Sequence, residues 1–355
     1  MRPARTSIRN AALVALLGGV VVGCSGAAAP SPTAEPVRKV GVMIDSGSGQ
    51  DKSFNEFALK GARQASAEAG LDFTYVTPQA ASDYANTLEG MIAAEAPDLV
   101  ITVGFRMGDA TARSARSHPG IRFAIIDNEY SPGSGCAETV ADCYTSEGGL
   151  STVTSLMFAE DQVAYLAGTL AGCMTETGTV ATVAGVKIPP VVRFVTGFEN
   201  GARAYRPDVV TLHQYIPDFN DPDTGKTVAQ GFINSGADIV FGAGGNTGNG
   251  GLLAAMEAGV MAIGVDVDQY LTYPEVGKVL LTSAAKNVDV AAAAAVRDFA
   301  DGKLDGGVRV YTLANGAIGL APYHAWDAKI PAACKDAVKA AEAAVIADPT
   351  ITGGT

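Results

Sequence analysis

Short runs of β-branched and other apolar residues alternate with longer helical stretches from residue 38 onward. The first runs are RKVGVMID, DFTYV, DLVITVG and RFAIID, and predicted helices over residues 53–70, 80–95 and 107–117 separate them. Apolar runs this continuous are typical of strands that are buried on both faces, as in parallel sheets covered by helices. The pattern therefore predicts a doubly wound α/β fold.

A second series of the same kind follows, with strands TVATVAG, VVTLHQYI, ADIVFGAG and VMAIGVD. The helices predicted with it cover residues 160–173, 191–204, 224–235 and 248–259. Each series takes about 120 residues, a common domain size, so we expect two lobes. The elements that remain are strand VLLTS, a helix over 287–301 and a strand over 308–312. They are too few for a third domain, so we expect them to return and complete the two lobes.

The expected division of the body follows from this count. The first lobe is predicted to hold residues 38–157 and about 287–306, and the second lobe residues 158–286 and about 307–355. The chain then crosses between the lobes more than once.

The N-terminus has the pattern of an export signal. Three arginines precede the apolar stretch 11–22, which stops at Gly23 and Cys24. Twelve helical residues span about 18 Å, too short for a bilayer core of about 30 Å, so residues 1–23 are predicted to be a signal peptide. A cysteine after a small residue at this place resembles the lipobox of bacterial lipoproteins, in which Cys24 would be acylated and become the mature N-terminus; ordinary secretion is the alternative. Residues 24–37, rich in Pro, Ala and Ser, are predicted to form a flexible tether.

Export changes the interpretation of the four cysteines that remain besides Cys24, because an even number in an oxidising compartment suggests disulfides. Four cysteines can pair in three ways. The short interval from Cys136 to Cys143 lies in a Gly/Ser/Asp-rich loop and would close easily, which leaves Cys173 with Cys334. A zinc site is the alternative, but the chain lacks C-x-x-C spacing and has only three histidines.

Charge and motifs narrow the function. The chain has 25 basic and 37 acidic residues, and loss of the three signal arginines leaves 22 against 37, a charge of −15. Such a surface repels phosphate backbones, so nucleic-acid binding is not expected. Thr247 breaks the dinucleotide fingerprint after ADIVF, and Asn220 stands where a P-loop needs its first glycine. No G-x-S-x-G or H-E-x-x-H motif occurs, so we expect neither an enzyme nor a bound cofactor or metal.

Polar residues gather where the predicted strands end. Asp45 follows the first strand, Asp127 the fourth and Asp266 the strand VMAIGVD, and the cluster GAGGNTGNG ends ADIVF. In open parallel sheets, ligands bind beyond the carboxyl ends of the strands. These residues are therefore predicted to line one cleft between the lobes, where a small molecule could bind.

The segment SFNEF begins a predicted helix at this cleft. Ser53 is the expected N-cap, and Glu56 would complete a capping box. Phe54 would lie in the first turn, either exposed to a ligand or packed in the core. Asn55 carries both a donor and an acceptor, which suits the edge of a nucleobase, although Asn is also common at helix starts.

Several segments occur together, in order, over residues 40–289: DKSFN, FAIID, VAYLAG, IPPVVRFVTGFENGA, FNDPDTGK, the Gly-rich strand end, IGVDVD and LTSAAKNVD. In this order they resemble the basic-membrane-lipoprotein family, ABC-transporter substrate-binding lipoproteins that include purine nucleoside receptors. The resemblance implies a fold similar to type I periplasmic binding proteins, with two Rossmann-like lobes joined by three crossovers.

The resemblance also implies a nucleoside, with purine the expected base, held between two aromatic rings. Phe54 matches the first ring; Phe219 is the favoured second ring and Phe198 the other candidate. Base stacking contributes about 1 to 3 kcal/mol per base and tolerates several bases, so polar groups must supply identity. Gly245 is expected to allow close approach of the backbone to the ligand, although Asn246 is an additional residue relative to the family's pattern there.

The polar groups are assigned by the same resemblance and by their positions at strand ends. The base edge is assigned to Asp45, Asn55 and Asp127. The ribose is assigned to Asp266, which can accept from two adjacent hydroxyls, and to Lys286, which can donate.

The expected protein is a monomer anchored by lipid to the extracytoplasmic face of the cell membrane, which delivers its solute to an ABC permease. A sugar-binding protein of similar fold is the nearest alternative, but the chain has one Trp and 7% aromatic residues, few of the platforms that pyranoses favour. A receptor that presents its ligand to a membrane sensor is a second alternative. An exported enzyme is a third, which the missing catalytic motifs disfavour.

Overall fold

The computed structural model describes residues 37–45 and 47–354. The predicted signal peptide, Cys24 and all but the last residue of the predicted tether lie outside these residues. Within them, no helix is both long enough and apolar enough to span a bilayer.

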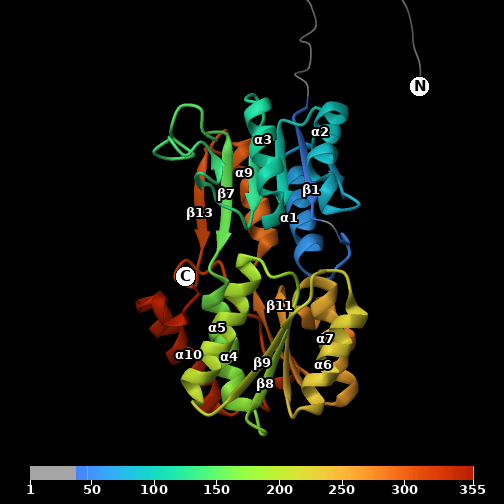
Figure 1. Ribbon diagram of the computed structural model, residues 1–355, viewed down its shortest axis with the longest axis vertical. Helices are drawn as coiled ribbons and strands as arrows, with labels where there is room; N and C mark the ends of the chain where they lie inside the picture. The colour runs from blue at the N-terminus through green and yellow to red at the C-terminus, as the bar shows by residue number, and fades with distance from the viewer. Residues whose placement is uncertain (1–36, 46, 355) are drawn as a thin grey trace, which may run out of the picture. The chain divides into compact units, whose positions relative to one another are not determined.

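The first lobe is built on a six-stranded parallel sheet in the order β13-β7-β4-β3-β1-β2 (Figure 1). Helices α1 and α9 pack together on one face of this sheet, and α2 and α3 on the other. The continuous apolar runs predicted this arrangement, since all five residues of β3 are buried. The strands are β1 (Lys39–Ile44), β2 (Asp72–Val76), β3 (Leu99–Val103), β4 (Arg122–Ile126), β7 (Val153–Phe158) and β13 (Gly307–Tyr311). The helices are α1 (Phe54–Glu68), α2 (Tyr84–Glu95), α3 (Gly108–Ser117) and α9 (Val288–Ala300).

The second lobe repeats this plan, with strand order β14-β12-β11-β10-β8-β9 and only β14 antiparallel among the pairings described. Helices α4 and α5 pack together, as do α6 and α7. The strands are β8 (Thr179–Ala184), β9 (Val210–Tyr215), β10 (Ile239–Ala243), β11 (Met261–Asp266), β12 (Leu280–Ala285) and β14 (Gly319–Leu320). The helices are α4 (Glu160–Met174), α5 (Pro189–Tyr205), α6 (Pro222–Asn234), α7 (Gly245–Ala258), α8 (Gln269–Thr272) and α10 (Ala332–Ala347).

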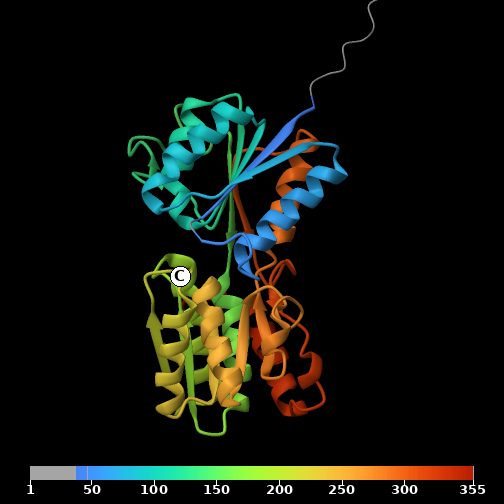
Figure 2. The same ribbon diagram turned by 90° about the vertical axis from the view of Figure 1, so that its right-hand side faces the viewer.

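Three crossovers join the lobes, as the resemblance implied. The chain enters the second lobe after β7, returns after β12 to form α9 and β13, and leaves again toward β14. Figure 2 shows α9, in orange, beside the blue helix α1, although hundreds of residues separate them in sequence. This topology confirms the predicted fold class of two doubly wound α/β lobes joined by three crossovers.

Three details of the prediction were wrong. Strand β7 was not predicted, because the polar Thr154 and Ser155 interrupt its apolar pattern, yet both are buried. Strand β13 was assigned to the second lobe but pairs with β7 in the first, so the lobe boundary lies after Tyr311 rather than near residue 306. Helix α10 was not predicted either; it is mostly exposed alanine with few large apolar residues to mark a buried face.

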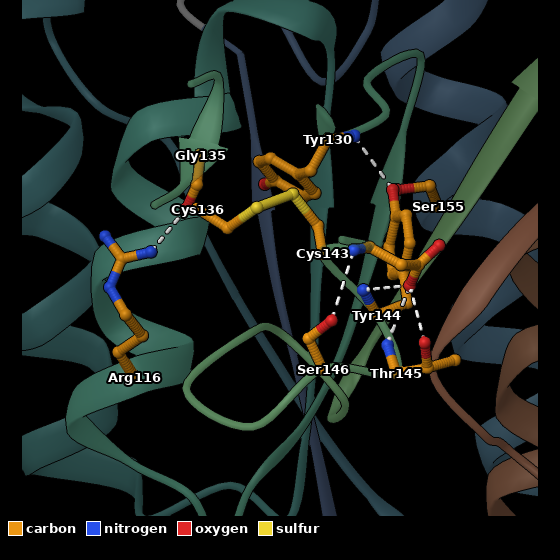
Figure 3. Close-up of a disulfide and its surroundings, with 10 residues drawn as sticks. Arg116, Tyr130, Gly135, Cys136, Cys143, Tyr144, Thr145, Ser146 and Ser155 are labelled. Atoms are coloured by element: carbon orange, nitrogen blue, oxygen red, sulfur yellow. Dashed lines mark hydrogen bonds between the residues drawn. A yellow bond between two sulfur atoms is a disulfide. The ribbon is translucent and has the colours of Figure 1, made fainter. Parts of the chain in front are cut away.

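The four cysteines meet in the pairs that the interval argument favoured. The sulfur atoms of Cys136 and Cys143 lie 1.92 Å apart, and those of Cys173 and Cys334 lie 2.02 Å apart. Figure 3 shows the first pair in the connection between β4 and β7, which includes the short strands β5 (Ser131–Pro132) and β6 (Gly135–Cys136), beside Tyr130 and Tyr144. The second pair joins the end of α4 to the start of α10, 161 residues further along the chain.

Helices α4 and α5 approach so closely that glycine is required between them. A β-carbon on Gly168 of α4 would lie 1.9 Å from the carbonyl oxygen of Phe198 in α5. On Gly201 of α5 it would lie 2.0 Å from the carbonyl oxygen of Tyr165 in α4. Since those neighbours are backbone atoms, they cannot move aside as a flexible side chain could, and the helix pair depends on these glycines.

We expect Gly168→Ala to lower the free energy of unfolding by about 2 kcal/mol or more, because the added methyl group forces the helices apart. Urea unfolding followed by circular dichroism measures the change. Gly90→Ala in α2 is the matched control: nothing lies within 4 Å of its β-carbon, so it should be neutral or stabilise by about 0.5 to 1 kcal/mol. Equal effects of the two substitutions would contradict the close-packing interpretation.

Candidate ligand-binding site between the lobes

One pocket lies at the carboxyl ends of the strands of both sheets, and it encloses about 680 Å³ with its open mouth included. The eight ligand-binding residues predicted from the sequence all line it: Asp45, Phe54, Asn55, Asp127, Phe219, Gly245, Asp266 and Lys286. The topological rule therefore brings together side chains that are up to 241 positions apart.

Aromatic rings from both lobes line this pocket. Phe54 lies in the first turn of α1, in the first lobe, and is half-buried. Phe219 lies between β9 and α6 in the second lobe, also half-buried, and its ring leaves no room for a β-carbon on Gly185. Phe198, the other candidate, does not line the pocket: it is fully buried, with its ring centroid 5.0 Å from that of Phe241. Of the two candidates, only Phe219 can reach a ligand in this pocket.

The start of α1 is capped differently from the prediction. The side chain of Ser53 makes no capping hydrogen bond. Instead, the carboxylate of the buried Asp51 accepts from the backbone N–H groups of Ser53, Asn55 and Glu56, at 2.9 to 3.1 Å. Glu56 accepts from the N–H of Lys52, which is one residue earlier than a capping box requires. Asp51 therefore fixes the loop that carries Phe54 and Asn55 into the pocket.

A buried ammonium group organises the floor of the site. Lys286 is 2% exposed, and its Nζ lies 2.6 Å from carboxylate oxygens of both Asp127 and Glu160. The Nε of Arg193 donates to the other oxygen of Glu160 at 2.6 Å. Burial opposes the charged form of Lys286, but attraction to Asp127, Glu160 and Asp266 outweighs it and raises the pKa of the lysine. The lysine is therefore charged at neutral pH.

Two acids of the pocket have strongly raised pKa values. Burial raises the pKa of Asp127 to about 6, with repulsion from Glu160 adding to the rise and Lys286 opposing it. Burial likewise raises the pKa of Asp266 to about 6, and Lys286 and a hydrogen bond from Ser53 oppose this rise. Both residues have left-handed backbone conformations, with φ of 72° and 65°, which Asp tolerates better than most residues. Both groups are therefore carboxylates, able to accept hydrogen bonds, at neutral pH, and become protonated as the pH falls through about 6.

Arg106 is a residue of this region that the sequence argument missed. Its Nε donates to Oδ2 of Asp45 at 3.1 Å and its Nη2 to Oδ1 at 2.7 Å, and the hydroxyl of Tyr84 donates to the same carboxylate. Its guanidinium also lies 5.5 Å from the ring centroid of Phe219, across the cleft. Arg106 follows β3, so the strand-end rule that selected Asp45 could have found it.

Amide side chains complete the polar lining. The Oδ1 of Asn55 is buried without a hydrogen-bond partner among the described residues, so an N–H donor on a ligand would find an unused acceptor there. Asn246 also lines the pocket and donates to Asn220. Gly245 has φ of +57°, a conformation that favours glycine. The pocket therefore offers flat apolar rings and several hydrogen-bonding groups, as recognition of a flat, polar-edged molecule requires. In the part of the chain that the structure describes, no group of three or more metal-ligating side chains could hold a metal ion.

The chain has two α/β lobes with largely parallel sheets, three crossovers between them and a pocket at the strand ends. These features define a substrate-binding protein of the periplasmic type. The model for one family, described as ABC transporter substrate-binding protein PnrA-like, matches residues 38–343. The chain belongs to this family, Bmp, whose members bind transport substrates and are not enzymes.

Individual relatives agree with this assignment. The chain is 30% identical to the ABC transporter nucleoside-binding protein BmpA of Lactococcus lactis subsp. cremoris, over 85% of this chain and 87% of the relative. It is 30% identical to an uncharacterized lipoprotein of Pyrococcus abyssi, over 88% of this chain and 74% of the relative. A solved ABC transporter solute-binding protein from Aeropyrum pernix K1 superposes with a TM-score of 0.72 at 28% identity, over 87% of this chain and 86% of that one.

We expect Lys286→Met to lower the free energy of unfolding by about 3 to 5 kcal/mol at pH 7.5, because it leaves buried carboxylates without their cation. The loss should be smaller at pH 5. An acid whose pKa is raised in the folded state destabilises the fold when ionised, and that penalty disappears as the pH falls through the folded pKa toward the unfolded value. For Asp127 and Asp266 this interval runs from about 6 down to 3.8.

Urea unfolding of both proteins at pH 5 and pH 7.5 measures the difference. Lys303→Met is the control, because Lys303 is exposed and pairs with Asp301 at the surface, so its loss should change stability by less than about 0.5 kcal/mol. A loss for Lys286→Met that is the same at both pH values would contradict the role given to the buried acids.

Proposed function

We propose that this ABC-transporter substrate-binding protein holds a nucleoside, with a purine as the preferred base, in the pocket between its lobes and delivers it to a membrane permease. One observation carries the proposal: two half-buried rings from opposite lobes, Phe54 and Phe219, line a pocket that is also lined by carboxylates of both lobes. A base needs aromatic faces above and below it, and a ribose needs acceptors for its hydroxyls. The nucleoside-binding relative supports this choice of ligand.

The polar groups are proposed to divide the ligand between them. Asp45 and Asn55, which both line the pocket, would bind the base edge, and the unused Oδ1 of Asn55 would accept from a base N–H. Asp266 would accept from the ribose hydroxyls. The ion pair of Asp127 with Lys286 closes the floor between them. The carboxylates that line this pocket disfavour a phosphate group, so a nucleoside suits it better than a nucleotide.

The proposed delivery mechanism needs only closure of the lobes. Contacts between the lobes occur on both sides of the pocket, by Ser53 with Asp266 and by Arg106 with the ring of Phe219. Hinge motion at the three crossovers would open the pocket, and the closed, ligand-bound monomer would be the form that the permease recognises. Outside the cell the cysteine pairs would be disulfides, and the pair Cys173–Cys334 would tie the C-terminal helix to the second lobe.

Ligand-dependent thermal unfolding of the body, residues 25–355, tests the ligand class. A purine nucleoside at 100 times its Kd should stabilise the fold by about 2.7 kcal/mol, whereas sugars and nucleoside monophosphates should not. A panel of nucleosides, free bases, monophosphates and sugars is compared by the shift in the unfolding midpoint. A shift with a sugar and none with any nucleoside would contradict the proposal.

Within the same experiment, Phe54→Ala tests the stacking ring. Loss of one stacked face should weaken nucleoside binding by about 5- to 150-fold, equivalent to 1 to 3 kcal/mol, as isothermal titration calorimetry measures. Phe57→Ala is the matched control: Phe57 lies one turn further along α1 and does not line the pocket. Equal affinities for the two variants would remove the stacking model.

The lipid anchor is also proposed, and the relatives named lipoproteins support it. Acylated Cys24 would keep the protein on the extracytoplasmic face of the membrane. We expect Cys24→Ser to appear in the soluble fraction of cells and to lose incorporation of labelled palmitate. Retention of the variant in the membrane fraction would contradict an anchor at this residue.

A further inference from the structure

The hydroxyl of Ser53 does not cap helix α1, because the neighbouring Asp51 takes that role. A serine at this position normally caps its helix through its side chain. Here Asp51 accepts from the N–H groups at the start of α1, so the Ser53 hydroxyl is not needed as a cap. It points instead to the second lobe, where it donates to Oδ2 of Asp266 at 2.7 Å.

We propose that Ser53 is a positioning residue: its hydroxyl, carried by the first lobe, orients the Asp266 carboxylate of the second lobe for the ligand, so that closure of the lobes completes the binding site. The proposal rests on the proposed function to the extent that Asp266 binds ligand. It adds a residue that does not itself line the pocket.

The contact is well suited to orient a side chain. Ser53 is fully buried and Asp266 is 6% exposed, so water does not compete strongly for either group. The only other hydrogen bond described for this hydroxyl is a longer one, of 3.5 Å, to the carbonyl of Val265. A hydrogen bond to a charged carboxylate is also stronger than one between neutral groups. Because one oxygen of Asp266 is held by Ser53, the carboxylate keeps one rotamer at the wall of the pocket.

Neighbouring contacts hold Ser53 in place across the cleft. The amide of Asn249 donates to the carbonyl oxygen of Asp51 at 3.0 Å, and the hydroxyl of Thr272 donates to that of Lys52 at 2.8 Å. The Nζ of Lys52 lies 4.0 Å from the ring centroid of Tyr273 and 3.4 Å from a carboxylate oxygen of Glu275. Residues 51–53 thus form an interlobe latch, and we use this name for them. Of these contacts, that of Ser53 is the one that reaches the carboxylate of Asp266.

The charge around Asp266 makes the contact measurable by pH. The charged groups that act on it are Lys286, which lowers its pKa, and Asp51 and Glu160, which raise it. Burial is the largest influence and raises the pKa to about 6, while the Ser53 hydrogen bond lowers it. A protonated carboxyl is a weaker acceptor than a carboxylate for two ribose hydroxyls, because one oxygen now carries the proton, so ligand affinity should fall as the pH drops through about 6. Without the hydroxyl, Asp266 should protonate at a higher pH.

The experiment measures the affinity for inosine by calorimetry from pH 5 to pH 8. We expect Ser53→Ala to weaken binding by about tenfold or more at pH 7.5, and to shift the loss of affinity to higher pH. Thr272→Val is the matched control, because it removes a hydrogen bond of the same latch without touching Asp266. Thr272→Val should weaken binding without moving the pH profile. Asp127 also titrates near pH 6, but it contributes equally in both variants and so does not cause a difference between them.

An unmoved pH profile for Ser53→Ala would overturn the proposal and leave Ser53 as an ordinary tie between the lobes. Asp266→Asn gives a second route, because in that background Ser53→Ala should change the affinity little; additive losses would also overturn it. If the wild-type protein binds no nucleoside, the proposed function fails. The contact between Ser53 and Asp266 is then tested separately, by urea unfolding without ligand of Ser53→Ala, Asp266→Asn and the double variant. Non-additive losses of stability would then support the contact, and additive losses would contradict it.

Discussion

The buried ammonium of Lys286 is the interaction on which both lobes depend. It lies in the crossover between β12 and α9, and it pairs with Asp127 of the first lobe and with Glu160 at the start of the second. Its Nζ also lies 4.9 Å from the ring centroid of Phe158, which ends β7, and that ring stacks on Tyr311 at the end of β13. Two of the three crossovers therefore meet at this charge, and the third begins at a ring that stacks on one of its neighbours. A charge this deeply buried is tolerated only while its partners stay in place, so the floor of the pocket depends on this cluster of ion pairs.

The two lobes contribute to the pocket in the same way because they share one topology. When the two sheets are compared strand by strand, β4 and β11 occupy the same place, and Asp127 and Asp266 stand at their carboxyl ends. Both residues have a left-handed conformation and a carboxyl pKa of about 6. The equivalent positions after β3 and β10 are Gly104 and Gly244, and both have positive φ. The pocket is thus made of two similar half-sites, each an acid and a glycine turn, which face a common space.

The sequence was sufficient for features that depend on one strand and its end. Buried apolar runs identified most of both sheets, and the rule for strand ends together with the family resemblance selected eight residues that line one pocket. It was insufficient where a residue's role depends on the opposite lobe. Glu160 was expected only as the first residue of a helix, but it is fully buried beside Lys286. Ser53 had the pattern of a cap, but Asp51 occupies that role. Such exchanges depend on distances of a few ångströms between segments far apart in sequence, and no local pattern records them.

The division of the site between lobes has a consequence for affinity. Phe54 and Asn55 belong to the first lobe, while Phe219 and Asp266 belong to the second, so an open form would present only half of the groups to a ligand. The measured affinity then includes the free energy of closing, and a residue outside the pocket can change affinity by changing that term. The closed form buries three carboxylates, those of Asp127, Glu160 and Asp266, near Lys286 and Arg193. Keeping these charges away from water makes closure costly in free energy. Hydroxyl and N–H donors on a ligand would offset that cost by satisfying the carboxylates, whereas a phosphate would add to it. In the proposed function, the same acids that raise the cost of closing would therefore make closure selective for a neutral ligand rich in donors.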